Sequence, residues 1–354
     1  MSASAPFLLP IDTAPMEAKR ADAIPVEQGV WQYEPKWDGF RCLSFKDGNA
    51  VDIRAKSGKP LARYFPELVD HLSNLPAAQF VIDGEILIER TGNYSFDALQ
   101  MRLHPAESRI RKLAVETPAK LMVFDMLADP TGQVLTDRPL SGRRAALERL
   151  VRSIGSADIQ LSPATLDLMQ AKKWLQNSGG NTDGVIAKRL DGPYLPGERA
   201  MVKVKRMRTA DCVVGGFRYL ADRREAGSLL LGLYDKDGRL DHVGFTSTIS
   251  NDERTELTHR LEALREPPGF TGKAPGGPSR WSTERSGEWE PLRPELVVEV
   301  RFDHVTGDRF RHGTKLLRWR PDKSPSQCTF DQFRKDTSVG ASALLSVKTG
   351  RSLQ

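Results

Sequence analysis

The chain has few of the residues that build disulfide frameworks or metal centres. Its 354 residues include three cysteines, Cys42, Cys212 and Cys328, whose scattered spacing indicates neither a disulfide framework nor a zinc module. The six histidines form no metal-ligand pattern. No apolar run is long enough to cross a bilayer, and the N-terminus lacks the basic region of a signal peptide. We therefore expect a cytoplasmic protein with no membrane partner.

The charge distribution suits a polyanionic partner. The formal net charge is +6 at pH 7, and basic residues cluster at 203–208 and again at 309–323. A positive surface of this kind attracts nucleic acid, although a solvated charged face would carry the same clusters. The chain is long enough for about two domains.

The most informative segment is residues 36–41, which fit the pattern Lys-x-Asp-Gly-x-Arg. A lysine attacks an α-phosphate only as the deprotonated amine. This chemistry therefore needs a cation-rich, partly desolvated site that lowers the pKa of the lysine. Asp38 and Gly39 predict a tight turn that lets backbone approach a nucleotide, and Arg41 offers a fork of donors for ribose or phosphate. An ordinary strand end with a turn fits the same letters, so the interpretation depends on partners further along the chain.

Two segments follow that could complete such a site. Residues 80–88 have apolar residues on both sides of an acidic segment, Asp83-Gly84-Glu85. This pattern predicts a strand broken by, or paired across, Asp83-Gly84. Glu85 could accept hydrogen bonds there from a ribose or a metal-bound water, and a hairpin with an exposed glutamate is the alternative. Residues 54–59 predict a basic turn that contacts phosphates or is a plain surface loop.

Three later segments carry further candidate side chains. A buried strand is predicted around Phe124, which either stacks on a purine base or belongs to the core. Residues 182–188 predict an acidic turn before a β-branched strand that ends in a lysine. In the predicted strand 201–205, Lys203 and Lys205 project to one face and repel each other unless an anion lies between them. A triphosphate would serve, and an exposed sheet face would also tolerate them.

These segments occur once each and in order, and the set resembles the covalent nucleotidyltransferase superfamily of ATP-dependent DNA ligases, RNA ligases and mRNA capping enzymes. The resemblance implies that Lys36 is the nucleophile that becomes adenylated, and that Glu85 and Asp183 bind metal. It implies that Glu34 contacts the adenine and that Phe124 stacks on the base. It implies that Arg41 and Arg54 contact ribose and phosphate or the nick, and that Glu85 contacts the ribose. Lys203 and Lys205 are implied contacts to the α-phosphate. Two positions depart from the family pattern: Asp183 stands where glutamate is common, and Met201 where an aromatic is common.

The C-terminal part changes to short predicted strands at 212–217, 228–234, 240–245 and 296–302, with a hairpin signal at Asp237-Gly238. Several short strands predict a small barrel, and the resemblance implies an OB-fold. Near its end the pattern Arg-x-Asp-Lys matches the last ligase motif, in which Arg320, Asp322 and Lys323 orient the leaving pyrophosphate.

The resemblance implies an α+β fold, with a nucleotidyltransferase domain of antiparallel sheets flanked by helices followed by the OB barrel. We expect these domains at 1–207 and 208–336, a flexible tail at 337–354 and a hinge near 205–209.

Residues 95–102 and 228–234 resemble the short stand-alone actinobacterial ligase C type and the ligase module of multifunctional end-joining ligases. This implies an ATP-dependent DNA ligase that seals 5′-phosphate/3′-hydroxyl nicks through a lysyl-AMP intermediate, with Mg²⁺ or Mn²⁺, in DNA repair. The implied partners are nicked double-stranded DNA and a primase-polymerase or other repair proteins, for a monomeric protein at the nucleoid.

Three alternatives stay open on the sequence. A GTP-using capping enzyme shares the motifs, and an RNA ligase shares the active site. A catalytically inactive nucleic-acid-binding protein is disfavoured, because each motif keeps its reactive residue type.

Overall fold

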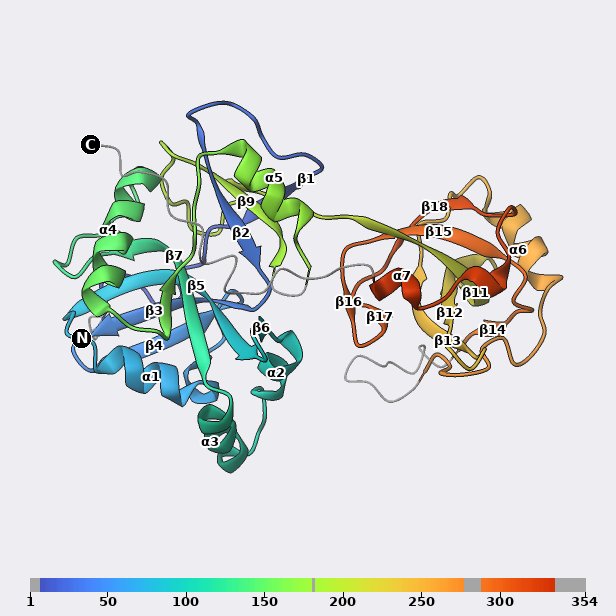
Figure 1. The fold of residues 1–354 in the computed structure, drawn as a ribbon, viewed down its shortest axis with the longest axis horizontal. Coiled ribbons are helices and arrows are strands. Elements are labelled where there is room, and N and C mark those ends of the chain that lie inside the picture. Colours follow the sequence, from blue (N-terminus) through green and yellow to red (C-terminus); the bar gives the residue numbers. More distant parts are fainter. Residues whose placement is uncertain (1–6, 180–181, 277–287, 335–354) are drawn as a thin grey trace. The chain divides into compact units, whose positions relative to one another are not determined.

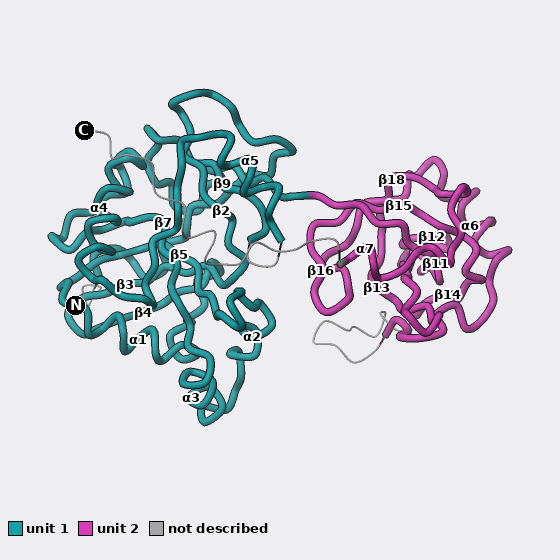
Figure 2. The backbone as a smooth tube through the Cα atoms, viewed as in Figure 1, with its two compact units in different colours: residues 1–206, 338–354 teal, residues 207–337 magenta. Residues whose placement is uncertain are grey.

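The computed structural model describes residues 7–179, 182–276 and 288–334 (Figure 1). The chain divides into two compact units, with the boundary between Arg206 and Met207 (Figure 2). The tail expected at 337–354 lies outside the described residues. Among the described residues, no helix has both the length and the apolar character needed to cross a membrane.

The first unit contains a six-stranded sheet in the order β4-β3-β5-β7-β8, with β6 paired to β5. Its neighbours are antiparallel except β7 and β8, which run parallel. The strands are β3 (Phe40–Asp47), β4 (Ala50–Ala55), β5 (Gln79–Arg90), β6 (Asn93–Tyr94), β7 (Ala119–Ala128) and β8 (Ile159–Leu161). Helices α1 (Pro66–Ser73) and α4 (Leu140–Ile154) pack against this sheet, so the predicted antiparallel sheet with flanking helices is confirmed.

The sequence explains where these two helices form. Helix α1 begins at Pro66, whose missing N–H costs nothing at the first helical position. Helix α4 places Ala146, Leu147 and Leu150 in the core of the six-stranded sheet. Burial of an apolar face supplies most of the stability of a surface helix.

A second sheet in the first unit has four strands in the order β1-β10-β9-β2. The strands are β1 (Ala18–Ala21), β2 (Trp31–Trp37), β9 (Thr182–Arg189) and β10 (Met201–Lys205). Helix α5 (Leu168–Gln176) packs against β2 and β9, where Trp174 and Val185 share a core with Trp37. The other elements of this unit are η1 (Ala62–Tyr64), α2 (Phe96–Met101) and α3 (Glu107–Glu116).

Two segments predicted to contain acidic turns are continuous strands instead. Strand β5 runs without a break through Asp83-Gly84, and only its register with β7 shifts there. Strand β9 already includes Asp183-Gly184; Gly184 pairs with β2 and β10, and the register with β2 shifts at Asp183. An Asp-Gly pair favours a turn where the backbone would otherwise hydrogen-bond to water. In these two segments, neighbouring strands supply backbone hydrogen bonds instead.

Strand β2 passes into β3 across only two residues, Asp38 and Gly39, although the strands belong to different sheets (Figure 1). A Cβ atom on Gly39 would lie 2.3 Å from the carbonyl oxygen of Ile86 on β5. The close approach that this glycine permits is therefore to β5, and its approach to a nucleotide stays a prediction.

The second unit is built on a six-stranded sheet in the order β13-β12-β11-β15-β18, with β14 paired to β11. The strands are β11 (Arg208–Tyr219), β12 (Ala226–Tyr234), β13 (Leu240–Thr246), β14 (Glu290–Pro291), β15 (Val297–Phe302) and β18 (Lys315–Trp319). The two edges of the sheet meet where Thr314 bridges Thr246, whose Oγ1 donates to the Thr314 carbonyl at 3.0 Å. The sheet closes into a small barrel, as predicted.

Smaller elements complete the second unit. Helix α6 (Arg254–Glu262) packs on β12 and contributes Leu257 and Leu261 to the barrel core. The predicted hairpin turn at Asp237-Gly238 is confirmed between β12 and β13. The rest are β16 (Val305–Thr306), β17 (Arg309–Phe310), η3 (Pro325–Gln327) and α7 (Asp331–Arg334).

The crossing at Gly39 yields a prediction about stability. We expect Gly39→Ala to lower the free energy of unfolding by about 3 kcal/mol, because the added methyl group collides with backbone that cannot move aside. Gly142→Ala near the start of α4 is the control, since a Cβ there meets no atom within 4 Å. It should raise stability by about 0.5 kcal/mol. Urea unfolding of both variants checks this, and equal effects would refute the packing argument.

Candidate active site

A cavity of about 250 Å³ in the first unit is lined by six of the nine site residues predicted in that unit. Both sheets contribute to it: β1, β2, β9 and β10 on one side, and β3, β5 and β7 on the other. The residues that line it are Glu17, Ala18, Glu34, Pro35, Lys36, Trp37, Arg41, Lys56, Glu85, Phe124, Ile186, Lys188, Met201 and Lys203.

The predicted nucleophile Lys36 lies on β2 with about a quarter of its side chain exposed (23%). Its Nζ donates to Asp183 Oδ2 at 2.9 Å, and Lys205 Nζ lies 2.9 Å from the same oxygen. Burial alone would raise the pKa of Asp183, but the two lysines outweigh it and hold that pKa below its ordinary value. Asp183 is therefore an ionised bridge between the nucleophile and one of the two predicted phosphate contacts.

Lys203 projects from β10 into the cavity. Burial lowers the pKa of its ammonium, and the charges of Lys36 and Lys56 lower it further. Neighbouring cations destabilise each other in this way until an anion joins them. This end of the cavity is therefore suited to bind phosphate.

The guanidinium of Arg41 is held on the cavity wall by a buried carboxylate. Arg41 donates from Nε to Asp83 Oδ1 at 3.1 Å and from Nη2 to Asp83 Oδ2 at 2.7 Å. Asp83 has no exposed side-chain surface, whereas 18% of the Arg41 side chain is exposed. The guanidinium also lies 5.4 Å from the ring centroid of Phe124. A bidentate pair of this kind fixes the guanidinium relative to the carboxylate that holds it.

Glu85 faces the cavity from β5. Its Oε1 accepts the backbone N–H of Gly39 at 3.0 Å. Burial raises the pKa of Glu85 to about 7, although Lys36 and Arg41 act in the opposite direction. A cation beside such a desolvated carboxylate stabilises its ionised form.

Glu34 and Phe124 lie at one end of the cavity together with Lys188. Glu34 is 2% exposed; its Oε2 lies 2.9 Å from Lys188 Nζ, and its Oε1 accepts from Gln32 Nε2 at 2.8 Å. The Lys188 ammonium lies 4.6 Å from the ring centroid of Phe124. The face of the Phe124 ring can stack on a nucleobase, and the neighbouring Glu34–Lys188 ion pair offers polar contacts to the edge of that base.

Arg54 does not line the cavity. Its guanidinium binds both carboxylate oxygens of Asp52, at 2.9 and 2.7 Å. Lys56, two residues further on, lines the cavity instead, and its Nζ lies 3.1 Å from Glu17 Oε1. Asp52 and Arg54 are both on β4 and share a face because side chains repeat every second residue, so the sequence did contain this signal.

Sequence reasoning assigned no role to several residues that the structure brings to the site. Lys188 lay in a recognised segment, and its charge beside apolar neighbours was a usable signal. Asp83 was interpreted only as part of a turn. Glu17 and Tyr194 carry no local pattern, because their partners are distant in the chain.

Two of the three predicted residues of the second unit, Arg320 and Lys323, bind a further residue, Asp211 on β11. Arg320 donates to Asp211 Oδ1 at 2.7 Å and also forms a forked pair with Asp322. Lys323 donates to Asp211 Oδ2 at 2.5 Å. The Arg320 contact lowers the pKa of Asp322 to about 2. Two cations are thus held side by side on one carboxylate.

No group of three or more histidine, cysteine, aspartate or glutamate side chains within the described ranges could hold a metal ion. Glu85 nevertheless fits a divalent cation that takes its other ligands from phosphates and water, the usual pattern for Mg²⁺. Asp183, the second predicted metal ligand, binds Lys36 and Lys205 through Oδ2.

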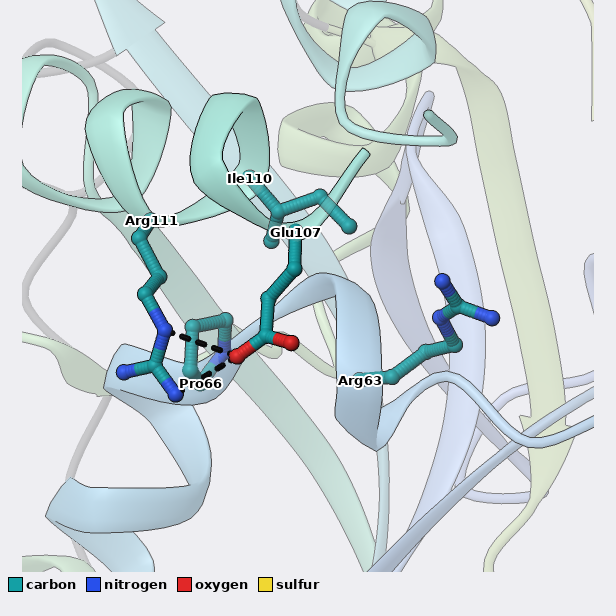
Figure 3. Close-up of a pocket in the computed structure, with 5 residues that line it drawn as sticks. All are labelled: Arg63, Pro66, Glu107, Ile110 and Arg111. Atoms are coloured by element: carbon teal, nitrogen blue, oxygen red, sulfur yellow. Dashed lines mark hydrogen bonds and ion pairs between the residues drawn. The ribbon is translucent and has the colours of Figure 1, made fainter. Parts of the chain in front are cut away.

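A separate cavity of about 320 Å³ lies beside η1, α1 and α3, and Figure 3 shows its lining. Arg63, Pro66, Glu107, Ile110 and Arg111 line it. Glu107 and Arg111 are paired at 2.7 Å and neutralise each other. No predicted site residue lines this cavity, so the first cavity is the candidate active site.

Comparison with known proteins identifies similar chains. Residues 15–205 match the family described as ATP dependent DNA ligase domain, and residues 222–323 match the ATP dependent DNA ligase C terminal region. The chain is 46% identical over 329 residues to DNA ligase C1 of Mycolicibacterium smegmatis, and the match covers 90% of this chain and 93% of that protein. It is 42% identical over 361 residues to DNA ligase C of Mycobacterium tuberculosis, which covers 96% and 98%.

A solved structure from work on Lig E DNA ligases is similar in fold. It matches 87% of this chain and 99% of its own length, with a TM-score of 0.56 and 18% identity. The likeness confirms the predicted fold class.

The raised pKa of Glu85 predicts a pH-dependent stability. Folding raises this pKa from 4.5 to about 7, so the folded chain holds the proton more tightly than the unfolded chain between these values. The stabilisation is complete below about pH 4.5 and is lost as the pH rises through about 7. Relative to Glu85→Gln, the wild-type chain should lose roughly 2 kcal/mol between pH 5 and pH 8.

Urea unfolding of the metal-free and nucleotide-free chains at several pH values measures this difference. A difference between the two chains that stays constant from pH 5 to pH 8 would show that Glu85 is ordinarily ionised.

Proposed function

The chain belongs to the ATP-dependent DNA ligases, and from that premise we propose how its own residues seal a nick. Lys36 attacks the α-phosphate of ATP, a nitrogen–phosphorus bond forms, and the bond to the β-phosphate breaks to release pyrophosphate. The 5′-phosphate of a nick then attacks the lysyl-AMP and displaces the lysine. Finally the 3′-hydroxyl attacks that phosphate, which joins the strand and releases AMP.

One observation carries the nucleophile assignment. Among the lysines that the structure describes, Lys36 both lines the cavity and donates from Nζ to the buried carboxylate of Asp183. We propose that Lys203, which lines the cavity, and Lys205, which shares Asp183 with Lys36, offset the charge that develops on the α-phosphate and the leaving pyrophosphate.

We propose that the remaining cavity residues bind ATP in a defined direction. Phe124 stacks on the adenine, and Glu34 accepts hydrogen bonds from it. Arg41 donates to ribose or phosphate, and Glu85 serves the ribose and the metal. Arg54 was a predicted contact to phosphate or the nick, and we propose that Lys56 takes this role instead, because Lys56 lines the cavity and Arg54 does not.

Mg²⁺ is the proposed metal, with Mn²⁺ as a substitute, held by Glu85 together with Asp183. When bound it offsets negative charge on the triphosphate.

The proposed partner is nicked double-stranded DNA, and the proposed setting is DNA repair beside a primase-polymerase or other repair proteins. The relatives include the Mycobacterium tuberculosis protein named multifunctional non-homologous end joining DNA repair protein, which is 31% identical over 322 residues and of which the chain covers 39%. We propose that the chain acts as a monomer with domains at 1–207 and 208–336 and a hinge near 205–209.

The first test labels the enzyme with ATP radioactive at the α-phosphate and then adds nicked DNA. We expect a labelled protein whose label moves to the DNA, and Lys36→Ala should abolish the protein label because the attacking amine is gone. Lys172→Ala, an exposed lysine on α5, is the control and should label normally.

Labelling by GTP alone would favour a capping enzyme and overturn the ligase assignment. Nicked duplexes that differ only in their 2′-hydroxyls distinguish a DNA ligase from an RNA ligase. Sealing by Lys36→Ala with ATP would show that another residue is the nucleophile.

A second prediction concerns Arg320, which we propose orients the leaving pyrophosphate together with Asp322 and Lys323. Arg320→Ala should slow self-adenylation by about a hundredfold, the usual loss when one fixed donor to developing charge is removed. Sealing of a nick that already carries AMP should change little, because no pyrophosphate leaves in that step.

The matched control is Arg318→Ala, two residues earlier on β18, where the side chain is 63% exposed and pairs with Glu299. An equal loss in both steps for Arg320→Ala would count against a role confined to pyrophosphate release.

A further inference from the structure

One buried tyrosine joins three parts of the first unit behind the active-site wall. Tyr194 is 2% exposed and lies in the segment between β9 and β10. Its hydroxyl donates to Asp83 Oδ2 at 2.6 Å. The same hydroxyl oxygen accepts the backbone N–H of Met16 at 3.0 Å. A single oxygen atom thus connects residues that are far apart in the chain.

Within the part of the chain that the structure describes, the carboxylate of Asp83 accepts three side-chain hydrogen bonds. Two come from the Arg41 guanidinium, and the third comes from the Tyr194 hydroxyl. Two donors from one guanidinium leave the carboxylate and the guanidinium able to turn together as a pair. The third donor comes from another element and opposes that rotation, so it fixes the plane in which Arg41 presents its remaining donors to the cavity.

The ionisation of the tyrosine favours this role. Burial raises the pKa of Tyr194 well above its usual value, and the negative charge of Asp83 acts in the same direction. The hydroxyl therefore keeps its proton at neutral pH and remains a donor to Asp83.

The contact with Met16 extends the effect to a second wall of the cavity. Met16 directly precedes Glu17, which lines the cavity and accepts the backbone N–H of Met201 through its carbonyl at 3.1 Å. The backbone N–H of Leu195 also lies 3.3 Å from Met16 Sδ. The segment that carries Tyr194 is thereby attached to the strand pair β1 and β10, which holds Lys203.

We propose that Tyr194 is a positioning residue for the first step of ligation: it acts through Asp83 to hold the Arg41 guanidinium in the orientation that binds ATP. The proposal rests on the proposed role of Arg41 in nucleotide binding. Removal of the hydroxyl alone should leave the fold intact but allow Arg41 and Asp83 to turn.

The test compares Tyr194→Phe with Tyr33→Phe. Tyr33 is also 2% exposed in the first unit, its hydroxyl donates to the Pro25 carbonyl at 2.8 Å, and it does not line the cavity. Tyr194→Phe loses two hydrogen bonds, to Asp83 and from Met16, whereas Tyr33→Phe loses one, so the thermal midpoint should fall further for Tyr194→Phe. Tyr194→Phe should slow self-adenylation at limiting ATP by about tenfold, as expected for a displaced catalytic donor, while Tyr33→Phe stays within about twofold.

A double-mutant cycle with Arg41→Lys separates positioning from general destabilisation. Lysine cannot form the forked pair with Asp83, so in that background Tyr194→Phe should slow self-adenylation by less than about twofold. An undiminished tenfold effect in the Arg41→Lys background would overturn the proposal, as would equal rates for Tyr194→Phe and Tyr33→Phe.

The wild-type chain in the same assay distinguishes the two levels of inference. If it forms no lysyl-AMP from ATP, the proposed function fails; if it does and only the cycle fails, the positioning role of Tyr194 alone is wrong.

Discussion

The active site depends on a constraint of backbone packing: two strands that follow each other in the chain must enter two different sheets. Only Asp38 and Gly39 lie between β2 and β3, so the second strand turns away from the first sheet within one step. The turn is possible because Gly39 lets the chain lie against Ile86 of β5, where any Cβ would collide. Lys36 before the crossing and Arg41 after it therefore face the same cavity from different sheets. In the pattern Lys-x-Asp-Gly-x-Arg, the Asp-Gly pair is therefore the connection between the two strands that carry the lysine and the arginine.

Part of this arrangement could be predicted from the sequence. A continuous apolar run located the strand around Phe124, and alternation located the strand around Lys203. The basic turn near Lys56 was also recognised, because these features depend on local hydrophobic pattern and turn chemistry. The Asp-Gly pairs show the limit. Asp237-Gly238 forms the expected hairpin, whereas Asp183-Gly184 lies inside a strand. The letters are the same in both pairs, and only the neighbouring strands decide between the two structures.

The carboxylates of the site illustrate the second limit of local reasoning. Lys203 and Lys205 indicated that an anion was needed between cations, and the sequence pointed to a nucleotide. In the structure Asp183 already supplies one negative charge to Lys205 and to Lys36. This partner lies on an adjacent strand but far away in the chain, so periodicity along one strand could not reveal it. Pairing register is a tertiary property, and charge compensation follows from it.

Buried ions at the site cannot be explained by their contribution to stability. The pairs Glu34–Lys188 and Arg41–Asp83 each remove charges from water, and the attraction within such pairs commonly does no more than offset that loss. Their common property is geometric, since each buried carboxylate fixes a cation at the cavity wall. The apolar cores of the two sheets must supply the stability that these pairs do not, and the cavity lies where both sheets meet. A site that must hold a polyphosphate and a base in one orientation therefore gains more from fixed charges than from further apolar packing.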